Sequence, residues 1–395
     1  MTRGTHRRLA ILILAAASLF LCVTPTSRSA TEALPQRLAD GTFWSIVSEF
    51  SEPDGFFRSD NLVSNELAFQ HVIPSLQAHA VPASAYVGVG PDQNFTYIVA
   101  LKPRIAFIVD IRRQNMLLHL MYKGLIELSP TRAEFVSRLF ARPIPNGVSA
   151  SMAPGDLLNA FQNEEPDPVA YERDWQDLKR QLVHVHGFPL NVGDMAGISY
   201  VYRAFYGAGP DIRYSFGRGS GWQPFPSYKD LMAEHDEAGA RRSYLATEEL
   251  YETLRDLEQR NLIVPLVGDF AGPKALRSVA RYLDLHHATV TAFYTSNVEQ
   301  YLFRGELWQH FYDNVATLPI DSHSTFIRAF FNPGRLMRSP GTQLVAPGAA
   351  FPPPGFIPPS GPRSETLLNP ISTLLAAYSE GRINSYNDVI QLSRY

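Results

Sequence analysis

The fold class is decided by residues 85–110, which read AYVGVGPDQNFTYIVALKPRIAFIVD. The apolar residues 85–90 predict a short strand, and the turn signal Pro91-Asp92-Gln93 leads into a predicted helix over residues 94–101. Pro103 ends that helix, and residues 104–110 are so apolar that they predict a strand buried on both faces. Apolar residues at helical spacing follow as far as Ile126. This order of strand, helix, strand and helix is typical of a doubly wound parallel sheet.

The same alternation returns in the second half of the chain. We expect further strands at residues 262–268, 288–294 and 325–331, with helices at 247–260 and 271–285 between them. Residues 31–346 are therefore predicted to form one α/β domain with a Rossmann-like, mostly parallel sheet flanked by helices. Pro265 argues against a simple central strand at residues 262–268, because proline cannot donate to a sheet ladder.

Three segments depart from this alternation. Residues 143–245 contain no convincing strand, so we expect a largely helical insertion or cap that serves as a lid. Residues 60–66 are mostly polar and are expected to open a helix that runs through Phe69 and Val72. Residues 347–395 are expected to follow the domain as a Pro-rich stretch and two short helices, at 365–378 and 386–393.

The first 30 residues have the order of an export segment. Arg3, Arg7 and Arg8 are followed by an apolar run over residues 9–23 and by small polar residues up to Ala30. This order predicts a signal peptide over residues 1–30, or an uncleaved anchor that provides the only contact with a membrane. The protein is then exported to the periplasm or secreted, or anchored. It is cytoplasmic if the first Met is not the true start.

Composition excludes several classes of protein. The net charge of −3 gives no general reason to expect nucleic acid as a partner, so we expect a small-molecule ligand. The single cysteine lies in the N-terminal apolar run, which leaves the rest of the chain without a thiol nucleophile or a cysteine metal ligand. Neither an HExxH motif nor a cluster of carboxylates accompanies the histidine pairs 184/186 and 286/287, and we expect no metal site. Walker and nucleophile-elbow motifs are also missing from the sequence.

The first strand and turn predict a crevice that can hold a ligand. Gly88 and Gly90 carry no side chains, so a ligand can approach the backbone there, and the next helix offers free N–H groups. Asp110 ends the second strand, 22 positions after Gly88, where its carboxylate can accept hydrogen bonds from ribose hydroxyls. The alternative is a tight strand-to-helix turn and an ordinary surface aspartate.

This segment resembles the first two motifs of class I S-adenosylmethionine-dependent methyltransferases, and the later strands resemble the second half of that fold. The resemblance implies that Gly88 and Gly90 line the methionine part of S-adenosylmethionine and that Asp110 holds its ribose. Tyr86 and Asp92 stand where that family has an acid and a third glycine. The segments at residues 59–66 and 86–91 also resemble a bacterial family of uncharacterised proteins with this kind of core.

Four further side chains are candidates for contact with a substrate. Asp269 ends a later strand and is expected to act as a base or to orient the acceptor. Asn297 and Glu299 follow another strand and can face the same crevice, while Asn65 lies in the polar run at residues 60–66. For each of them a purely structural role remains the alternative, because acids and amides also cap the ends of helices.

Two other functions stay open at this point. The first is an exported, non-catalytic binding protein that uses the crevice for another ligand, with the aromatic region from Tyr200 to Tyr214 lining it. The second is an NADP-dependent reductase, in which Arg112 and Arg113 meet the 2′-phosphate of the cofactor.

Overall fold

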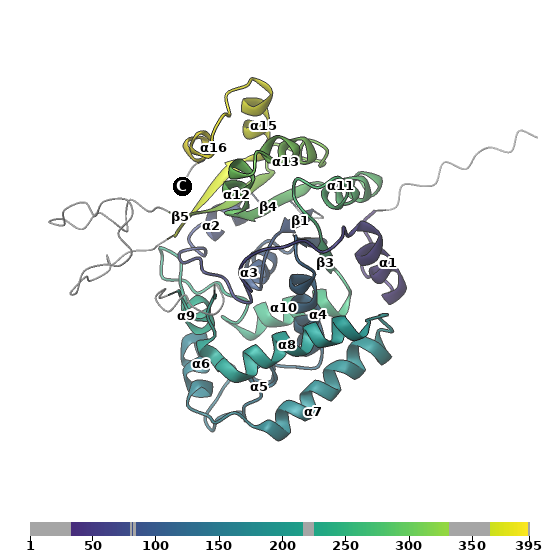
Figure 1. The fold of residues 1–395 in the computed structure, drawn as a ribbon. Coiled ribbons are helices and arrows are strands. Elements are labelled where there is room, and N and C mark those ends of the chain that lie inside the picture. The colour runs from purple at the N-terminus through teal and green to yellow at the C-terminus, as the bar shows by residue number, and fades with distance from the viewer. Residues whose placement is uncertain (1–32, 80, 82–83, 216–224, 332–363, 394–395) are drawn as a thin grey trace, which may run out of the picture.

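The structure is a computed structural model, and it describes residues 33–79, 81, 84–215, 225–331 and 364–393 (Figure 1). The predicted export segment at residues 1–30 and the Pro-rich stretch at 347–362 lie outside the described residues. Among the described residues, no helix is long and apolar enough to cross a membrane.

A six-stranded sheet forms the centre of the molecule. Its strands lie in the order β3-β2-β1-β4-β5-β6, and every neighbouring pair is parallel except β5 and β6, which are antiparallel. The bounds are β1 Ala85–Gly88, β2 Ile105–Asp110, β3 Ile263–Val267, β4 Val290–Ser296, β5 Thr325–Phe331 and β6 Ser364–Pro370. This arrangement confirms the predicted α/β class with a Rossmann-like, mostly parallel sheet.

The position of β3 removes the conflict over Pro265. β3 is an edge strand that pairs with β2 alone, so a missing N–H on its outer side costs no ladder hydrogen bond. All residues of β1, β2 and β3 are buried, as expected for parallel strands that helices cover on both faces.

Helices cover both faces of the sheet (Figure 1). The connections from β1 to β2 and from β2 to β3 place α3 Gln93–Leu101, α4 Arg113–Glu127 and α10 Glu248–Gln259 on one face. The opposite face carries α11 Ala275–Leu285 and α13 Trp308–Val315, and α1 Asp40–Phe50 packs along the outer edge of β3. The shorter helices α12 Val298–Arg304, α15 Ile371–Ser379 and α16 Tyr386–Leu392 pack beside β4 and β6, and α2 Ile73–Ala78 packs on α3.

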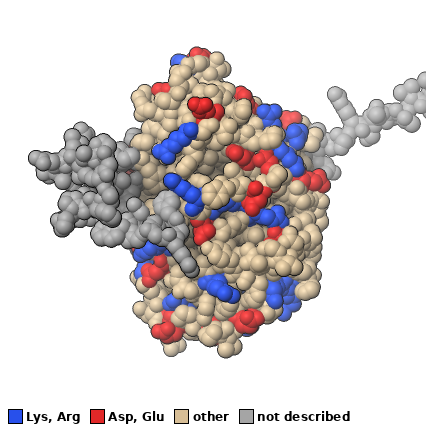
Figure 2. Space-filling model, in the orientation of Figure 1, with Lys and Arg blue, Asp and Glu red and all other residues tan. Residues whose placement is uncertain are grey.

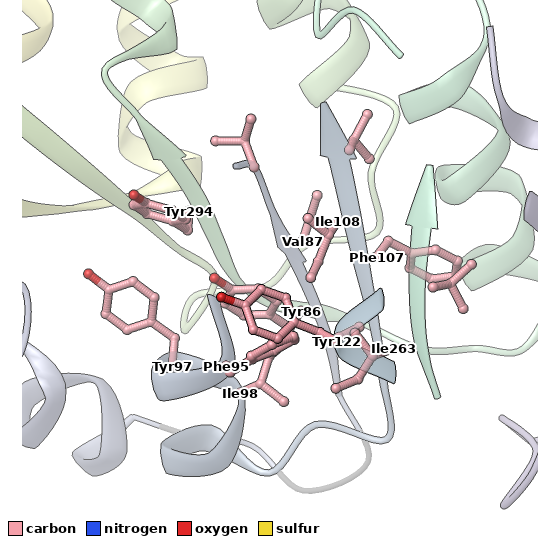
Figure 3. Close-up of a cluster of buried hydrophobic side chains, with 14 of the residues drawn as sticks. Tyr86, Val87, Phe95, Tyr97, Ile98, Phe107, Ile108, Tyr122, Ile263 and Tyr294 are labelled. Carbon is pink, nitrogen blue, oxygen red and sulfur yellow. The ribbon is translucent and has the colours of Figure 1, made fainter. Parts of the chain in front are cut away.

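The core on the α3 side is rich in aromatic residues (Figure 3). Phe95 makes edge-on ring contacts with Tyr122 and Tyr244, each with ring centroids 5.4 Å apart. Tyr97 of α3 lies against Tyr294 of β4, with ring centroids 5.2 Å apart. These rings fix the helix layer to the sheet directly beneath the carboxyl ends of β1 and β4.

The expected insertion is helical. It contains α6 Pro154–Gln162, α7 Pro168–Lys179, the π-helix η1 Arg180–Val185, α8 Val192–Ala208, the short 3₁₀ turn η2 Gly209–Asp211 and α9 Tyr228–Ala233. Its described residues hold no strand beyond one isolated bridge between Arg213 and Ser227. The longer helices pack on α4 and on α5 Arg132–Phe140, and so form a third layer outside the α4 face of the sheet.

Two predictions of secondary structure are wrong. The polar run at residues 60–66 opens no helix, because Asn61 and Ala68 take positive φ values of 48° and 64°, and the next helix begins only at Ile73. The helix expected from Glu365 begins at Ile371, and residues 364–370 form β6 instead. Pairing with the open edge of β5 outweighs the local helical pattern there.

Candidate functional site

A cavity of about 580 Å³ lies at the carboxyl ends of the parallel strands. The residues that directly follow β1, β2, β3 and β4 line it, namely Val89, Ile111, Gly268 and Asn297. The strand order reverses direction between β1 and β4, and doubly wound folds bind ligands in the crevice at such a switch point. The volume lies within the range of small-molecule and cofactor sites.

The two glycines of the first turn have different roles. Gly90 lines the cavity with a φ of +78°, and a Cβ added there would meet nothing closer than Asn61 Nδ2 at 3.6 Å. Gly88 does not line the cavity. A Cβ there would lie 1.9 Å from Asn94 Oδ1, so Gly88 serves the close packing of β1 on α3.

Asn94 holds this turn in place. Its Oδ1 accepts from the Tyr86 hydroxyl at 2.9 Å, and its Nδ2 donates to the carbonyls of Val89 at 2.8 Å and Pro91 at 2.7 Å. Tyr86 therefore supports the turn through Asn94. The Gly90 carbonyl in turn accepts from Nε2 of the buried His119 at 2.8 Å.

Asp92 points away from the cavity. The side chain is 1% exposed, and Oδ2 accepts from the Tyr244 hydroxyl at 2.9 Å. Burial raises the pKa of Asp92 to about 7, against the opposing effect of the Tyr244 hydrogen bond. Asp92 thus adds a polar group to the core and not to the cavity wall.

Asp110 lines the cavity beside Gly90, as the strand pattern predicted. The side chain is 5% exposed, which contradicts the alternative of an ordinary surface aspartate. Oδ1 accepts from the Arg112 backbone N–H at 3.0 Å and lies 3.5 Å from Arg112 Nε. Burial raises the pKa of Asp110, while Arg112 and the backbone of Gly90 act in the opposite direction.

Arg112 and Arg113 are both engaged by groups of this chain. The Arg112 guanidinium donates to the carbonyls of Ser59 and Asp60, and is almost completely buried. Arg113 forms a two-pronged pair with Asp194, with N–O distances of 2.6 and 3.0 Å. A phosphate in the crevice would have to compete with these partners for either guanidinium.

Asp269 also lines the cavity, in the turn between β3 and α11. Its Oδ1 accepts from the Ala271 N–H at 2.9 Å, and its own N–H donates to Glu52 Oε2 at 3.0 Å. Glu52 further accepts from the amides of Lys274 and Ala275 at 2.7 and 2.8 Å. A carboxylate of the chain therefore caps the start of α11, and the turn presents the Asp269 side chain to the crevice.

Asn65 and Asn297 line the cavity, but Glu299 does not. Glu299 is 1% exposed and forms a buried ion pair with Arg328, with Oε1 3.1 Å from Nη2, and it accepts from the Tyr312 hydroxyl at 2.8 Å. The prediction that Glu299 meets a substrate is wrong, since α12 begins at Val298 and its first turn directs residue 299 toward β5. The capping alternative also fails, because Asn297 makes no side-chain cap and Ser296 takes a φ of +51°.

Glu66 is a cavity residue that the sequence analysis missed. It is 1% exposed, its Oε2 accepts from Gln93 Nε2 at 2.9 Å, and its Oε1 accepts from the Ser296 hydroxyl. Burial raises the pKa of Glu66, and the Ser296 and Gln93 hydrogen bonds act in the opposite direction. Because a helix was expected over residues 60–72, Glu66 was not recognised as a cavity residue. Its place between the apolar residues Leu62 and Val63 on one side and Leu67 and Phe69 on the other was a signal of a buried carboxyl.

Aromatic rings form much of the remaining wall. They are Phe56, Phe57, Tyr214, Phe225, Phe270, Tyr294, Tyr301 and Phe331. The prediction of an aromatic lining therefore holds for Tyr214, whereas the Tyr200 hydroxyl donates to Asp60 at 2.7 Å outside the cavity. Tyr214 and Phe225 are the described residues of the insertion that reach the cavity, so its helices do not form the expected lid.

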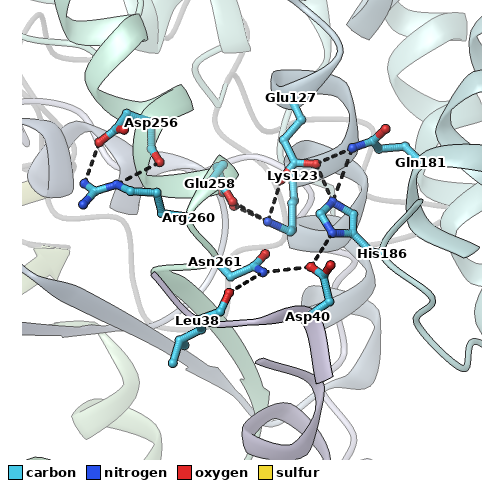
Figure 4. Close-up of polar contacts among 10 residues, drawn as sticks. All are labelled: Leu38, Asp40, Lys123, Glu127, Gln181, His186, Asp256, Glu258, Arg260 and Asn261. Atoms are coloured by element: carbon cyan, nitrogen blue, oxygen red, sulfur yellow. Dashed lines mark hydrogen bonds and ion pairs between the residues drawn. The ribbon is translucent and has the colours of Figure 1, made fainter. Parts of the chain in front are cut away.

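The histidines of the described residues do not meet the requirements of a metal site. No group of three or more His, Cys, Asp or Glu side chains in the described part of the chain could hold a metal ion. His186 instead bridges Asp40 and Glu127 through its two ring nitrogens at 2.7 and 2.6 Å (Figure 4). Acidic and basic side chains are interspersed over the face drawn in Figure 2.

One family matches the chain. DUF7790, described as a domain of unknown function, matches residues 61–144 and 215–345, which together make more than half of the chain. The unmatched gap between the two segments falls within the helical insertion, while Glu66, Gly90, Asp110, Asp269 and Asn297 all lie in matched segments. No curated protein matches the chain.

Proposed function

The chain belongs to the DUF7790 family, and we propose that it binds S-adenosylmethionine at the carboxyl ends of β1 and β2 and transfers the methyl group to a small molecule. The proposal is carried by one observation: the open Gly90 turn and the Asp110 carboxyl lie side by side in the wall of one cavity at the switch point of the sheet.

The turn has the shape that close approach of a ligand requires. A Cβ at Gly90 would point into space with its nearest neighbour at 3.6 Å, so the backbone there is open to a ligand. The contacts of Asp110 with Arg112 use Oδ1, and a carboxylate has about four acceptor positions. Asp110 therefore retains the capacity to accept hydrogen bonds from ribose hydroxyls.

The charge of the cavity favours a cationic ligand over a dinucleotide. Glu66, Asp110 and Asp269 all line it, while the lining arginines Arg58 and Arg304 are exposed to solvent. A diphosphate at the start of α3 would lie near Glu66, which bonds to Gln93 in the first turn of that helix. Since Arg112 and Arg113 already have carboxylate partners, NADP ranks below S-adenosylmethionine.

Different residues of the cavity have different roles in the proposed methyl transfer. S-adenosylmethionine supplies a methyl group on a positively charged sulfur. Gly90 lets the methionine part lie against the backbone, and Asp110 orients the ribose. Asp269 faces the cavity from the neighbouring turn, where it orients the acceptor or takes its proton. The aromatic wall excludes water from the reacting atoms.

Thermal unfolding of the protein with and without millimolar S-adenosylhomocysteine tests this proposal. We expect stabilisation of about 2.7 kcal/mol when the ligand is at 100 times its Kd. Asp110→Asn should abolish that shift, and Asp269→Asn should keep it, because Asp269 is assigned to the acceptor. A well-folded wild-type protein that shows no shift with this ligand would overturn the proposal.

A second candidate is an exported binding protein without catalytic activity. It is favoured by the contacts between Asp110 and Arg112, which already give the expected ribose acid a partner within the chain. The predicted export segment at residues 1–30 would agree with this candidate, since S-adenosylmethionine is made in the cytosol. Binding of a small molecule in the same cavity, without any response to S-adenosylhomocysteine, is the result that distinguishes it.

A further inference from the structure

Glu66 differs from the other buried acids of the protein. Six buried acids each form an ion pair with Lys or Arg, namely Asp110, Asp174, Asp194, Asp236, Glu258 and Glu299. Among the described residues, no ion pair involves Glu66 or Asp92. Asp92 faces the core, so Glu66 is the buried acid that lines the cavity without a cationic partner. Burial of a carboxylate without a counter-ion is costly, and such groups cluster at functional sites.

The carboxyl group of Glu66 is held rigidly by neutral donors. Ser296 from the end of β4 donates to Oε1, and Gln93 from α3 donates to Oε2 at 2.9 Å. The Ser64 hydroxyl donates to Gln93 Oε1, which turns the amide N–H₂ of Gln93 toward Glu66. Tyr294 is a further hydrogen-bonding neighbour. This shell fixes the position of the carboxyl but brings no positive charge to it.

The wider surroundings of Glu66 are aromatic. Tyr86 of β1, Tyr97 of α3, Tyr294 of β4 and Tyr386 of α16 are the titratable groups that face it. Tyr294 also lines the cavity and lies against Tyr97 (Figure 3). An acid combined with electron-rich ring faces is the chemistry that recognises organic cations.

We infer that Glu66 is the counter-ion of a cation subsite in the crevice, which takes an ammonium or sulfonium group of a small ligand. The Glu66 carboxylate supplies the charge, and Tyr294 with the other cavity rings supplies an aromatic surface for the carbon atoms around the cation. For S-adenosylmethionine as the ligand, this inference rests on the proposed function. For any other organic cation it stands independently of that function.

Binding of a cation at this subsite should release a proton from Glu66. Burial raises the pKa of Glu66, so the ligand-free protein holds a larger fraction of this side chain in the neutral form than an exposed glutamate would have. A bound cation favours the carboxylate and therefore releases that proton. Affinity for the cation should then rise with pH until Glu66 is ionised in the free protein.

Isothermal titration of the full chain with four probes tests the inference. S-adenosylmethionine carries a sulfonium and an ammonium group, S-adenosylhomocysteine keeps only the ammonium, adenosine has neither, and phenethylamine is a simple organic ammonium. Glu66→Gln should weaken the binding of the cationic probes at least about tenfold, and should remove the pH dependence, without any effect on adenosine. Asp92→Asn is the matched control, because Asp92 is a buried acid at the start of α3 that faces the core, and it should leave every affinity unchanged.

Each outcome separates the inference from the proposed function. Weakening of S-adenosylmethionine alone identifies the sulfonium as the partner of Glu66, and equal weakening of S-adenosylhomocysteine identifies the ammonium. Glu66-dependent binding of phenethylamine without any binding of the adenosyl probes would support the cation subsite and reject the methyltransferase. Binding of the adenosyl probes that Glu66→Gln leaves unchanged would overturn the cation subsite alone. If none of the cationic probes binds the folded wild-type protein, both are wrong.

Discussion

Arg112 connects the end of β2 to the loop that carries the missed cavity acid. Its Nε lies 3.5 Å from Asp110 Oδ1, and its guanidinium donates to the carbonyls of Ser59 and Asp60. Asn61, Asn65 and Glu66 follow directly in that loop and line the cavity. One buried side chain thus sets both the charge environment of Asp110 and the position of the opposite wall.

Removal of the guanidinium should therefore destabilise the protein. Arg112→Met leaves the buried Asp110 carboxyl without its partner, and we expect the free energy of unfolding to fall by about 3–5 kcal/mol in urea titrations. Arg112→Met combined with Asp110→Asn removes the unpaired charge, so the double variant should recover part of the loss. Strictly additive effects of the two substitutions would show that the pair is not coupled.

The two predicted substrate residues that follow β4 should respond differently to substitution. Glu299→Gln breaks the buried pair with Arg328 and should cost about 3–5 kcal/mol of unfolding free energy. Asn297→Ala, two residues earlier at the cavity wall, should change stability by less than about 0.5 kcal/mol. Chemical denaturation of both variants and of the wild-type protein measures these two changes in unfolding free energy. A stable Glu299→Gln variant would mean that the ion pair contributes little to the fold.

Much of the sheet could be predicted from local sequence. Parallel strands with both faces buried are apolar throughout, so residues 104–110 and 262–268 were visible as strands without knowledge of their neighbours. β6 was not visible, because residues 364–370 become a strand only by pairing with the edge of β5, which is distant in sequence. Strand pairing of this kind leaves no local pattern.

The residues of the candidate site also differ in how far local sequence predicts their positions. Asp110 ends β2, and Gly90 and Asp269 each lie two residues after the end of a strand. The end of a parallel strand places a residue at the crevice whatever the rest of the chain does. Glu66 lies in an irregular loop, where tertiary contacts with Gln93 and Ser296 decide its position. Glu299 lies within a helical turn, so its direction depends on where α12 begins, and element boundaries are the least predictable feature of a sequence.

The roles of the two glycines in the first turn can be separated by substitution. A Cβ at Gly88 would overlap Asn94 Oδ1, whose side chain cannot retreat because it bonds to Tyr86 and to the carbonyls of the turn. We expect Gly88→Ala to cost about 1–3 kcal/mol of stability. Gly90→Ala has space but a φ of +78°, and should cost about 1–2 kcal/mol.

Ligand binding provides the second readout for these glycine variants. Gly90 lines the cavity, so Gly90→Ala should reduce the affinity for S-adenosylhomocysteine even where the protein is folded. Gly88→Ala should lower the apparent affinity only by reducing the fraction of folded protein. Titration at a lower temperature, where the variant is folded, should therefore restore the affinity of the wild-type protein. Equal loss of affinity in both folded variants would contradict the different roles assigned to them.

His186 should make the stability of the protein depend on pH. It bridges Asp40 of α1 and Glu127 of α4, and Lys123 lies within 2.7 Å of Glu127 in the same network (Figure 4). Burial disfavours the charged imidazolium, but the hydrogen bonds and charges of Glu127 and Asp40 outweigh burial and raise the pKa of His186. The folded state therefore binds this proton more tightly than the unfolded state.

The sign of the dependence follows from linkage. The contribution of His186 is fully present below the pKa of an unfolded histidine, about 6.5, and is lost as the pH rises through the raised pKa of the folded state. His186→Gln should thus cost about 1–3 kcal/mol of unfolding free energy near pH 5.5. The difference in unfolding free energy between His186→Gln and the wild-type protein should shrink as the pH rises above the pKa of the unfolded histidine.

His184→Gln is the matched control for this prediction, since His184 lies in the π-helix η1, two residues before the C-cap residue His186, and is exposed to solvent. Its unfolding free energy should follow that of the wild-type protein at every pH. Glu258, buried in the same network with a pKa raised to about 8, also weakens the fold as the pH rises, but it is present in all three proteins and cancels in the comparison. A difference between wild type and His186→Gln that stays constant from pH 5.5 to 8.5 would mean that His186 contributes only its neutral hydrogen bonds.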